Sequence, residues 1–409
     1  MRKILKSKLF KQSLIYGMTN AIYSGLPLIL LPFLVVILEP EEYGKVDLFR
    51  SLSSVFIPIL GLSAVQSISR FYFDLDEKSF KEFVSSIQIF QLVTSIFALI
   101  ILYIFKPLVS IDDFQLIFFC ILYFFFNQFT ESLLIVFRVK DNAIHYLYVR
   151  TFNIIVEIGL LTIFYFIFSE FTWILRVLPT VIACFLTAII AFLYFKRFNY
   201  HFEFNLSSLK KALIYSLPLV LHMLSGYILN IGDRFLIRYF LNDKELGNYA
   251  VAYQIGVAIS FFYTSFNLAW TPTFFRLMKE KKIEMINKVR ILVYISMICL
   301  AILILFCWII LSPYLLSNSN YNISLQIIFI ILIAYTILSF YKFESNFFMF
   351  NKNTKKLSFY TALSAGISIL LNILLIPRIG ILGSAYSALV SFSIIFLLVK
   401  FSKHNEEIA

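Results

Sequence analysis

Twelve continuous apolar runs, each long enough to cross a lipid bilayer as a helix, divide this chain of 409 residues. Helices are expected rather than strands, because the runs do not alternate and an open sheet edge cannot lie in hydrocarbon. The fold class predicted is therefore an all-α polytopic membrane protein with about 12 transmembrane helices. The runs lie near residues 14–38, 43–69, 83–105, 114–137, 147–168, 173–195, 209–232, 245–268, 289–311, 322–345, 357–376 and 381–399.

Composition excludes several other classes of protein. Hydrophobic residues make up 60% of the chain and charged residues 14%, whereas soluble domains carry ~25% charged residues. A disordered chain, a nucleic-acid-binding module and a soluble enzyme are therefore excluded. The four cysteines lie in apolar runs without disulfide or zinc spacing, so neither a metal nor another cofactor is predicted. They are Cys120, Cys184, Cys299 and Cys307.

The basic residues predict the orientation of the chain in the membrane. Of the 35 Lys and Arg residues, 27 fall at the N-terminus and in the connections on that side, and 5 fall in the opposite connections. Because cytoplasmic connections collect Lys and Arg, both termini are expected in the cytoplasm. The first run is too long for a signal-peptide core and lacks a cleavage site, so it is expected to remain as the first span.

The connections are short, which argues against catalysis. None much exceeds roughly fifteen residues, and the chain has no Walker A sequence or glycine-rich phosphate loop. A membrane glycosyltransferase or polysaccharide polymerase usually needs a sizeable outer loop. The sequence therefore predicts a protein that is not an enzyme.

Weak internal repeats predict two six-helix lobes, residues 1–200 and residues 201–409. With six spans in each half, both halves enter the membrane with the same polarity, so a pseudo-two-fold axis along the membrane normal is expected to relate them. A substrate site is then expected between the lobes. The repeats pair Leu14–Tyr16 with Leu213–Tyr215, Glu42–Gly44 with Glu245–Gly247, and Lys140–Asn142 with Lys352–Thr354.

Polar residues inside the spans recur at helical spacing. An ion at mid-bilayer costs about 2.5–3.5 kcal/mol, so such residues usually face a cavity or a partner. Asp47 and Arg50 share one helix face, and so do Arg150, Asn153 and Glu157. The alternatives are an intrahelical ion pair at the membrane rim for the first set and an anchoring pair at the helix end for the second.

The seventh run carries a longer polar stripe, which indicates a water-filled lumen. His222, Gly226, Asn230 and Asp233 share one face, with Arg234 beside it. The alternative is polar packing between helices. Packing is the first interpretation of the polar faces on runs eight and eleven, and cavity lining the second. These faces comprise Tyr249, Tyr253, Ser260 and Asn267, and Ser364, Ser368 and Asn372.

Four groups of short segments, in order along the chain, resemble the Wzx-type flippases. These are O-antigen and capsule repeat-unit exporters in the polysaccharide-biosynthesis branch of the MOP (multidrug/oligosaccharidyl-lipid/polysaccharide) superfamily, whose fold is MATE-like. The segments are Glu42–Gly44 with Gly61–Ala64 and Arg70–Tyr72; Ser216–Pro218 with Asp233–Ile237; Leu246–Tyr249; and Asn372–Pro377 with Gly380–Ala385.

The resemblance implies a flippase of the bacterial inner membrane. Its cargo would be an undecaprenyl-pyrophosphate-linked oligosaccharide, moved from the cytoplasmic to the periplasmic leaflet by alternating access. The implied partners are this substrate, membrane lipids and other polysaccharide-assembly membrane proteins, with no nucleic acid. The protein is expected to act as a monomer.

Candidate roles follow for the polar residues. Guanidinium groups bind phosphate bidentately, so arginines at both ends of the passage are expected to hold the pyrophosphate. Coupling to a proton or sodium gradient is the family expectation. The substrate-binding candidates are Arg50, Arg70, Arg234, Arg276, Asn230 and Tyr253, and the ion-coupling candidates are Asp47, Glu157, His222 and Asp233.

Two other functions are weighed against the flippase. A cation-coupled multidrug exporter of the same superfamily should present a net acidic lumen, whereas the embedded set here mixes acids with arginines. A membrane polysaccharide polymerase conflicts with the short outer connections.

Overall fold

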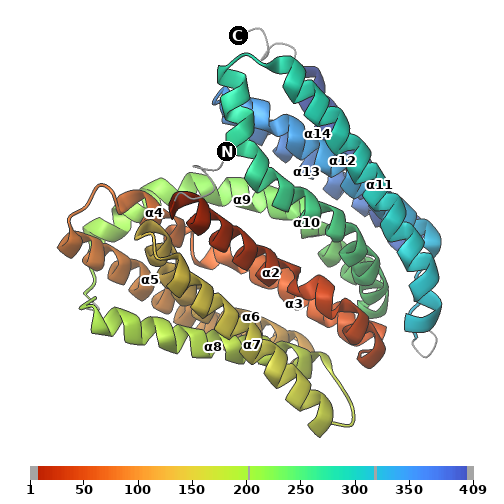
Figure 1. The fold of residues 1–409 in the computed structure, drawn as a ribbon. Coiled ribbons are helices and arrows are strands. Elements are labelled where there is room, and N and C mark those ends of the chain that lie inside the picture. The colour runs from red at the N-terminus through yellow and green to blue at the C-terminus, as the bar shows by residue number, and fades with distance from the viewer. Residues whose placement is uncertain (1–7, 201–202, 317–319, 403–409) are drawn as a thin grey trace. The chain divides into compact units, whose positions relative to one another are not determined.

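The structure is a computed structural model that describes residues 8–200, 203–316 and 320–402, without the side chains of residues 8–11, 13, 14 and 222. Within these ranges every regular element is a helix (Figure 1). The elements are α2 (Lys8–Ile37), α3 (Pro40–Leu60), η1 (Ala64–Gln66), α4 (Ser67–Phe71), α5 (Glu77–Ile104), η2 (Lys106–Leu108), α6 (Ile111–Val139), α7 (Ala143–Ile167), α8 (Trp173–Arg197), α9 (Leu206–Phe240), α10 (Asp243–Lys279), α11 (Ile283–Leu315), α12 (Leu325–Phe350), α13 (Thr354–Ile379) and α14 (Ile381–Ser402).

The predicted all-α membrane fold is confirmed. Each of the twelve apolar runs forms a helix, the second being divided between α3 and the η1–α4 segment. Ten described helices are long and apolar enough to cross a membrane, and eleven if the bent α3–α4 pair counts as one. The remaining helix, α10, has 37 residues and is richer in polar side chains. The chain is a multi-pass membrane protein.

The second predicted helix is broken, contrary to the expectation of one continuous span over 43–69. The α3 helix and the segment after it are bent by 68°. Pro58 lacks the N–H that would continue the ladder of hydrogen bonds, and Leu62 and Ser63 have positive φ angles of 44° and 53°. This left-handed pair ends the helix before η1 begins.

Side-chain caps fix where several helices begin. The Asp76 carboxylate accepts a hydrogen bond from the Ser79 N–H, and the Ser110 hydroxyl accepts one from Asp113. Asn242 and Ser324 cap α10 and α12 in the same way. Each cap satisfies an N–H group that has no partner within its helix.

Four helices end in the same left-handed turn. Beyond α6, α8, α10 and α12, one residue has a positive φ, and the next donates its N–H to a carbonyl five residues back. This is the Schellman pattern, which satisfies the last carbonyls of a helix. Here the left-handed position is held by Asp141, Asn199, Lys281 and Lys352 rather than by glycine.

These turns also correct the register of one predicted repeat. Asp141 and Lys352 occupy the left-handed position after α6 and α12, and an asparagine follows each of them. Asp141 therefore corresponds to Lys352, whereas the sequence comparison paired it with Asn353. By turn geometry this segment pair is therefore shifted by one residue from the register that the sequence comparison gave.

The chain divides into two compact units that do not follow the predicted boundary at residue 200. Unit 1 comprises residues 1–23 and 48–224, and unit 2 comprises residues 24–47 and 225–409. The long helices α2, α3 and α9 each contribute to both units, so the boundaries fall within helices. The pseudo-two-fold axis through the whole chain and the movement of two lobes remain predictions.

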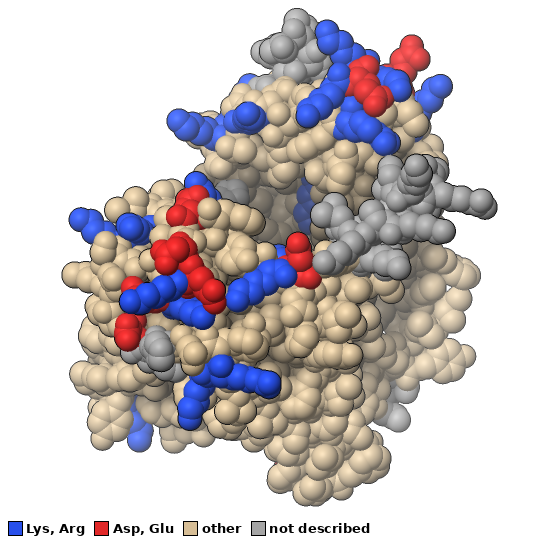
Figure 2. Space-filling model, turned by 60° about the vertical axis from the view of Figure 1, so that its left-hand side comes forward, with Lys and Arg blue, Asp and Glu red and all other residues tan. Residues whose placement is uncertain are grey.

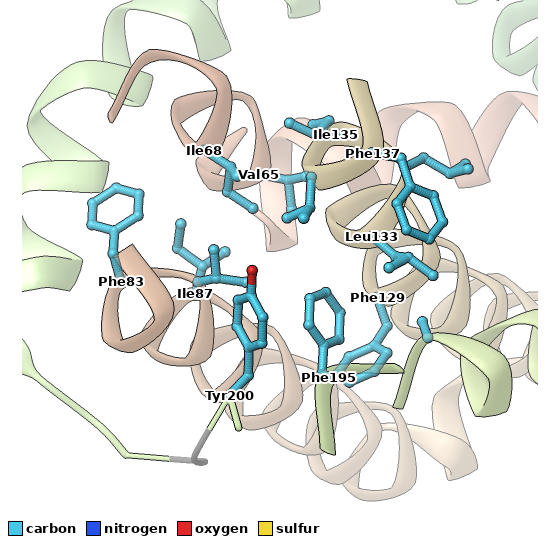
Figure 3. Packing of buried hydrophobic residues seen from close by; sticks show 14 of the residues in the cluster. Val65, Ile68, Phe83, Ile87, Phe129, Leu133, Ile135, Phe137, Phe195 and Tyr200 are labelled. Carbon is cyan, nitrogen blue, oxygen red and sulfur yellow. The ribbon is translucent and has the colours of Figure 1, made fainter. Parts of the chain in front are cut away.

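The core of unit 1 is a cluster of mostly aromatic and branched side chains from η1, α4, α5, α6, α7, α8 and α9 (Figure 3). Phe195 packs between Phe129 and Tyr200, and the Tyr200 hydroxyl is turned toward the cluster. Burial raises the pKa of the Tyr200 phenol. In unit 2, α12 is the central helix and contacts α10, α11, α13 and α14.

The surface suits contact with lipid. Large apolar side chains are exposed on most helices, among them Phe166, Leu221, Phe306 and Leu370. On the face drawn in Figure 2, charged side chains occupy limited areas, and a broad region carries none. In water such a surface would favour aggregation, whereas in a membrane it contacts acyl chains.

Candidate functional site

Arg234 is a charged residue of unit 2 that is only 2% exposed. Its Nε lies 3.1 Å from Asp47 Oδ2, and its Nη1 lies 2.6 Å from Asp233 Oδ1. The same Nη1 donates to the Asn230 carbonyl at 2.9 Å. Asp47 and Asp233, which were predicted to couple ions, thus bind Arg234, which was predicted to bind phosphate.

Hydroxyl groups complete this site, which we name the Arg234 cluster. The phenol of Tyr249 and the hydroxyl of Ser384 both donate to Asp233 Oδ2, the latter at 3.1 Å. The ring of Tyr253 lies 3.6 Å from the Arg234 guanidinium carbon. The cluster comprises Asp47, Asn230, Asp233, Arg234, Tyr249, Tyr253 and Ser384.

The Arg234 cluster carries two carboxylates and one guanidinium, a formal charge of −1 if both acids are ionised. Buried ions are tolerated when paired and hydrogen-bonded, as these are. In this conformation the Arg234 guanidinium is therefore bonded to Asp47, Asp233 and the Asn230 carbonyl. It would bind a phosphate only after its two carboxylates were displaced, whereas the excess carboxylate suits a proton or a small cation.

Arg50 differs from Arg234 in having no ion-pair partner among the residues that the structure describes. Asp47 bonds to Arg234, so the predicted intrahelical pair between Asp47 and Arg50 does not form. Arg50 is partly exposed on α3, and no ion pair to its guanidinium occurs within the described residues. This leaves Arg50 as an available cation in unit 1.

A second buried polar network lies in unit 1, between α6, α7 and α8. Arg150 donates to Glu131 at 2.5 Å and stacks on Tyr23, with the guanidinium carbon 4.2 Å from the ring centre. Glu157 accepts from Arg176 at 3.1 Å. The predicted polar face of α7 is thus buried.

The anchoring pair within α7 does not form, because both of its charges bond to neighbouring helices. Glu131 and Arg176 were not among the predicted site residues. Arg176 carries a signal in the sequence, since it is an arginine inside an apolar run. In each of the two ion pairs the arginine balances the carboxylate, so this network carries no net charge.

The other predicted residues have simpler surroundings. Arg70 pairs with Asp74 at 2.7 Å and is half exposed, and Arg276 is exposed near the end of α10. The side chain of His222 lies outside the part that the structure describes. Asn372 donates to Ser387 of α14 at 3.0 Å, which agrees with the packing interpretation of that polar face.

Three basic residues that the sequence count assigned to connections lie well inside helices, at least seven residues from the nearest helix end. They are Arg150 of α7, Arg290 of α11 and Lys342 of α12. Moving them out of the 27 leaves 24 basic residues against 5, so the charge bias persists. Arg290 bonds to the buried Glu344 at 3.0 Å, and Lys342 donates to Ser260 at 2.6 Å. All three positions lie inside the apolar runs 147–168, 289–311 and 322–345, so the sequence already predicted helices there.

The metal-ligating side chains of the described residues do not come together in a transition-metal site. Among the described residues, no group of three or more His, Cys, Asp or Glu side chains could hold a metal ion. Cys120 and Cys184 are buried apart from each other, and Cys299 and Cys307 are exposed on the apolar helix α11. The chemistry available is binding by charge and hydrogen bonds.

Residues 9–278 match the family described as polysaccharide biosynthesis proteins. This chain belongs to that family. An Lsg locus protein of Haemophilus influenzae is 25% identical over 395 residues, which are 92% of this chain and 95% of that protein. This polysaccharide biosynthesis protein therefore matches its relative over nearly the whole length of both.

Solved structures of other proteins have a fold similar to that of this chain. The lipid II flippase MurJ in an inward closed conformation has a TM-score of 0.74 at 14% identity, covering 95% of this chain and 88% of that chain. An inward-facing multidrug resistance MATE family transporter of the MOP superfamily has a TM-score of 0.68 at 14% identity, covering 97% and 96%. The predicted MATE-like fold is confirmed.

Proposed function

We propose that this protein is a Wzx-type flippase in O-antigen or capsule biosynthesis. It moves an undecaprenyl-pyrophosphate-linked oligosaccharide repeat unit from the cytoplasmic to the periplasmic leaflet by alternating access. No covalent bond changes in this process. The work of the protein is to lower the cost of taking a charged, hydrated head group across about 30 Å of hydrocarbon.

The observation that carries the proposal is Arg50. A polysaccharide biosynthesis protein keeps, inside a membrane helix, a partly exposed guanidinium that has no carboxylate partner among the described residues. Such a group is unfavourable in hydrocarbon, so it faces water or a ligand. A pyrophosphate is the anionic part of the proposed cargo, and guanidinium binds phosphate oxygens bidentately.

The Arg234 cluster supports coupling to a gradient of protons or sodium ions. Its second carboxylate lacks a compensating arginine, so it can take a proton or a cation without leaving a charge unbalanced. Asp47 and Asp233 are the coupling residues proposed on this basis. Glu157 is the weaker candidate, because Arg176 already balances it.

A net acidic site also suits the second candidate, a cation-coupled multidrug exporter. The two functions differ in what they transport. Drug accumulation in cells that lack the protein, with normal surface polysaccharide, would favour the exporter.

The same proposal places the protein in the bacterial inner membrane, with both termini in the cytoplasm. The support is the excess of basic residues on one side, which persists after the three helix residues are removed from it. The protein would act as a monomer, in contact with membrane lipids and other polysaccharide-assembly membrane proteins.

Deletion of the gene tests the function. We expect lipid-linked repeat units to accumulate in the cytoplasmic leaflet, where an impermeant reagent added outside spheroplasts cannot label them. Labelled, unpolymerised repeat units in the outer leaflet would identify a polymerase instead. Normal surface polysaccharide without accumulation would contradict the flippase.

A further inference from the structure

We propose that Lys342, together with Ser260, Asn267 and Asn346, forms a binding site in unit 2 for an anionic oxygen group of the transported molecule. The group is a phosphate or a carboxylate. This inference rests on the proposed function and deepens it, since it adds a second contact point for the cargo.

Lys342 lies well inside α12. Eight residues follow it before the helix ends at Phe350, which places it about 12 Å from that end at 1.5 Å per residue. Its side chain is partly exposed, and its Nζ donates to the Ser260 hydroxyl of α10 at 2.6 Å. An ammonium has three donors, and this bond uses one of them.

Lys342 has no carboxylate within ion-pair distance in the described part of the chain. Four arginines inside the described helices each have one. They are Arg150 with Glu131, Arg176 with Glu157, Arg234 with Asp47 and Asp233, and Arg290 with Glu344. Among the described residues, Lys342 therefore resembles Arg50, which also lies inside a helix without a carboxylate in ion-pair distance.

The nearest acid in sequence, Glu344, is directed elsewhere. Residues two apart on a helix point to different faces. Glu344 is 1% exposed, and its Oε1 accepts from Arg290 at 3.0 Å and from the Tyr294 phenol at 2.7 Å, both on α11. It is already balanced by Arg290, so the charge of Lys342 is left for a ligand.

Uncharged polar groups extend the site along the same helix pair. One turn beyond Lys342, Asn346 Nδ2 donates to Asn267 Oδ1 at 3.0 Å, and Tyr263 donates to the same oxygen at 3.3 Å. Ser260 and Asn267 are two turns apart on α10 and are both partly exposed. A ligand at Lys342 would thus meet a hydroxyl on one side and amides on the other.

The chemistry of these groups selects the ligand. An ammonium in a membrane helix faces water or an anion, because hydrocarbon solvates it poorly. Lysine binds phosphate or carboxylate as a compact point charge, and amides and hydroxyls bind sugar hydroxyl groups. In the proposed cargo, the anion is either the pyrophosphate of the lipid carrier or the carboxylate of an acidic sugar.

Calorimetric titration of the full-length protein in nanodiscs tests the site. The probes are inorganic pyrophosphate for the first source and glucuronate for the second. For whichever probe the wild-type protein binds, we expect K342Q to weaken binding at least tenfold and K342R to stay within about threefold. The control is K355Q, which makes the same chemical change at an exposed position at the start of α13.

A second variant covers the case in which K342Q fails to fold. S260D places a carboxylate beside Lys342, which balances the charge of Lys342 within the protein. The contact between α10 and α12 is then kept, while the anion site is blocked. We expect S260D to weaken binding at least tenfold as well. Unchanged binding in both K342Q and S260D, or no binding of either probe to the wild-type protein, overturns the proposal.

The site and the function can fail separately. If deletion traps repeat units in the cytoplasmic leaflet but S260D and K342Q bind anions normally, the function stands and the site is wrong. If both variants lose anion binding but deletion leaves lipid-linked repeat units unaffected, the site is an anion site of a different transporter.

Discussion

Gly44 of α3 and Gly247 of α10 oppose each other in a reciprocal contact near the starts of their helices. A Cβ atom on Gly44 would overlap the Asp243 carbonyl, and one on Gly247 would overlap the Pro40 carbonyl. Pro40 precedes Gly44 by the same four residues as Asp243 precedes Gly247. The pair of Glu-x-Gly repeats thus packs against itself, as residues related by a local two-fold axis do.

The contact predicts that alanine is not tolerated at either glycine. G44A and G247A should each lower the free energy of unfolding by about 1–3 kcal/mol, because the added methyl group meets backbone atoms that cannot move aside. Thermal unfolding of the purified protein in detergent measures this. G366A is the control, since a Cβ atom there meets nothing within 4 Å. Equal stability of G44A and G366A would contradict the close approach.

Arg234 should be needed for stability as well as transport. R234A leaves the buried Asp233 and the partly buried Asp47 without their cation, which should cost about 3–5 kcal/mol. R70A removes a half-exposed pair with Asp74, and such pairs are worth about 0–1 kcal/mol. A comparison of the two unfolding midpoints tests the difference. An R234A protein as stable as R70A would show that the guanidinium is not held as described.

Glu157 and Arg176 should behave as a coupled pair. Both side chains are buried, so E157Q strands the guanidinium and should cost about 3–5 kcal/mol. Adding R176Q to E157Q should recover much of that loss, because the unpaired charge is then gone. Thermal unfolding of the two single variants and the double variant completes the cycle. Additive losses would mean that the two residues do not interact.

The left-handed turn after α12 should accept glycine with a gain in stability. Lys352 has φ 58°, which is unfavourable for a side chain with a Cβ atom, so K352G should add about 0.5–1 kcal/mol. K355G makes the same replacement in the first turn of α13 and should cost up to about 1 kcal/mol. Opposite shifts in the unfolding temperature are expected. A destabilised K352G protein would contradict the turn geometry.

Much of the fold could be predicted because a membrane helix needs a long apolar run, and each such run is visible in the sequence. The break at Leu62 and Ser63 was missed, since Gly61 and Pro58 are compatible with either a kink or an end. Lys342 was counted with a connection although it lies inside the predicted run 322–345. Its hydrogen bond to Ser260 could not be predicted, because Ser260 comes from another helix.

The partners of the buried charges could not be predicted for a related reason. Helical spacing identified the polar face of α7, where Arg150, Asn153 and Glu157 are all buried, because that spacing is local. Whether Asp47 bonds to Arg50 or to Arg234 depends on packing between residues 187 positions apart. The sequence therefore supplied the candidate residues but not the pairs.

The most direct test of the central claim is flipping of a fluorescent lipid-linked oligosaccharide by the purified protein in liposomes. An ion gradient is imposed, and an impermeant quencher reports the fraction in the outer leaflet. We predict that the wild-type protein moves the lipid, that R50K retains part of the rate, and that R50A, folded to the same extent, loses at least tenfold. Equal rates for protein-free and protein-containing liposomes, or an unchanged rate in R50A, would contradict the account.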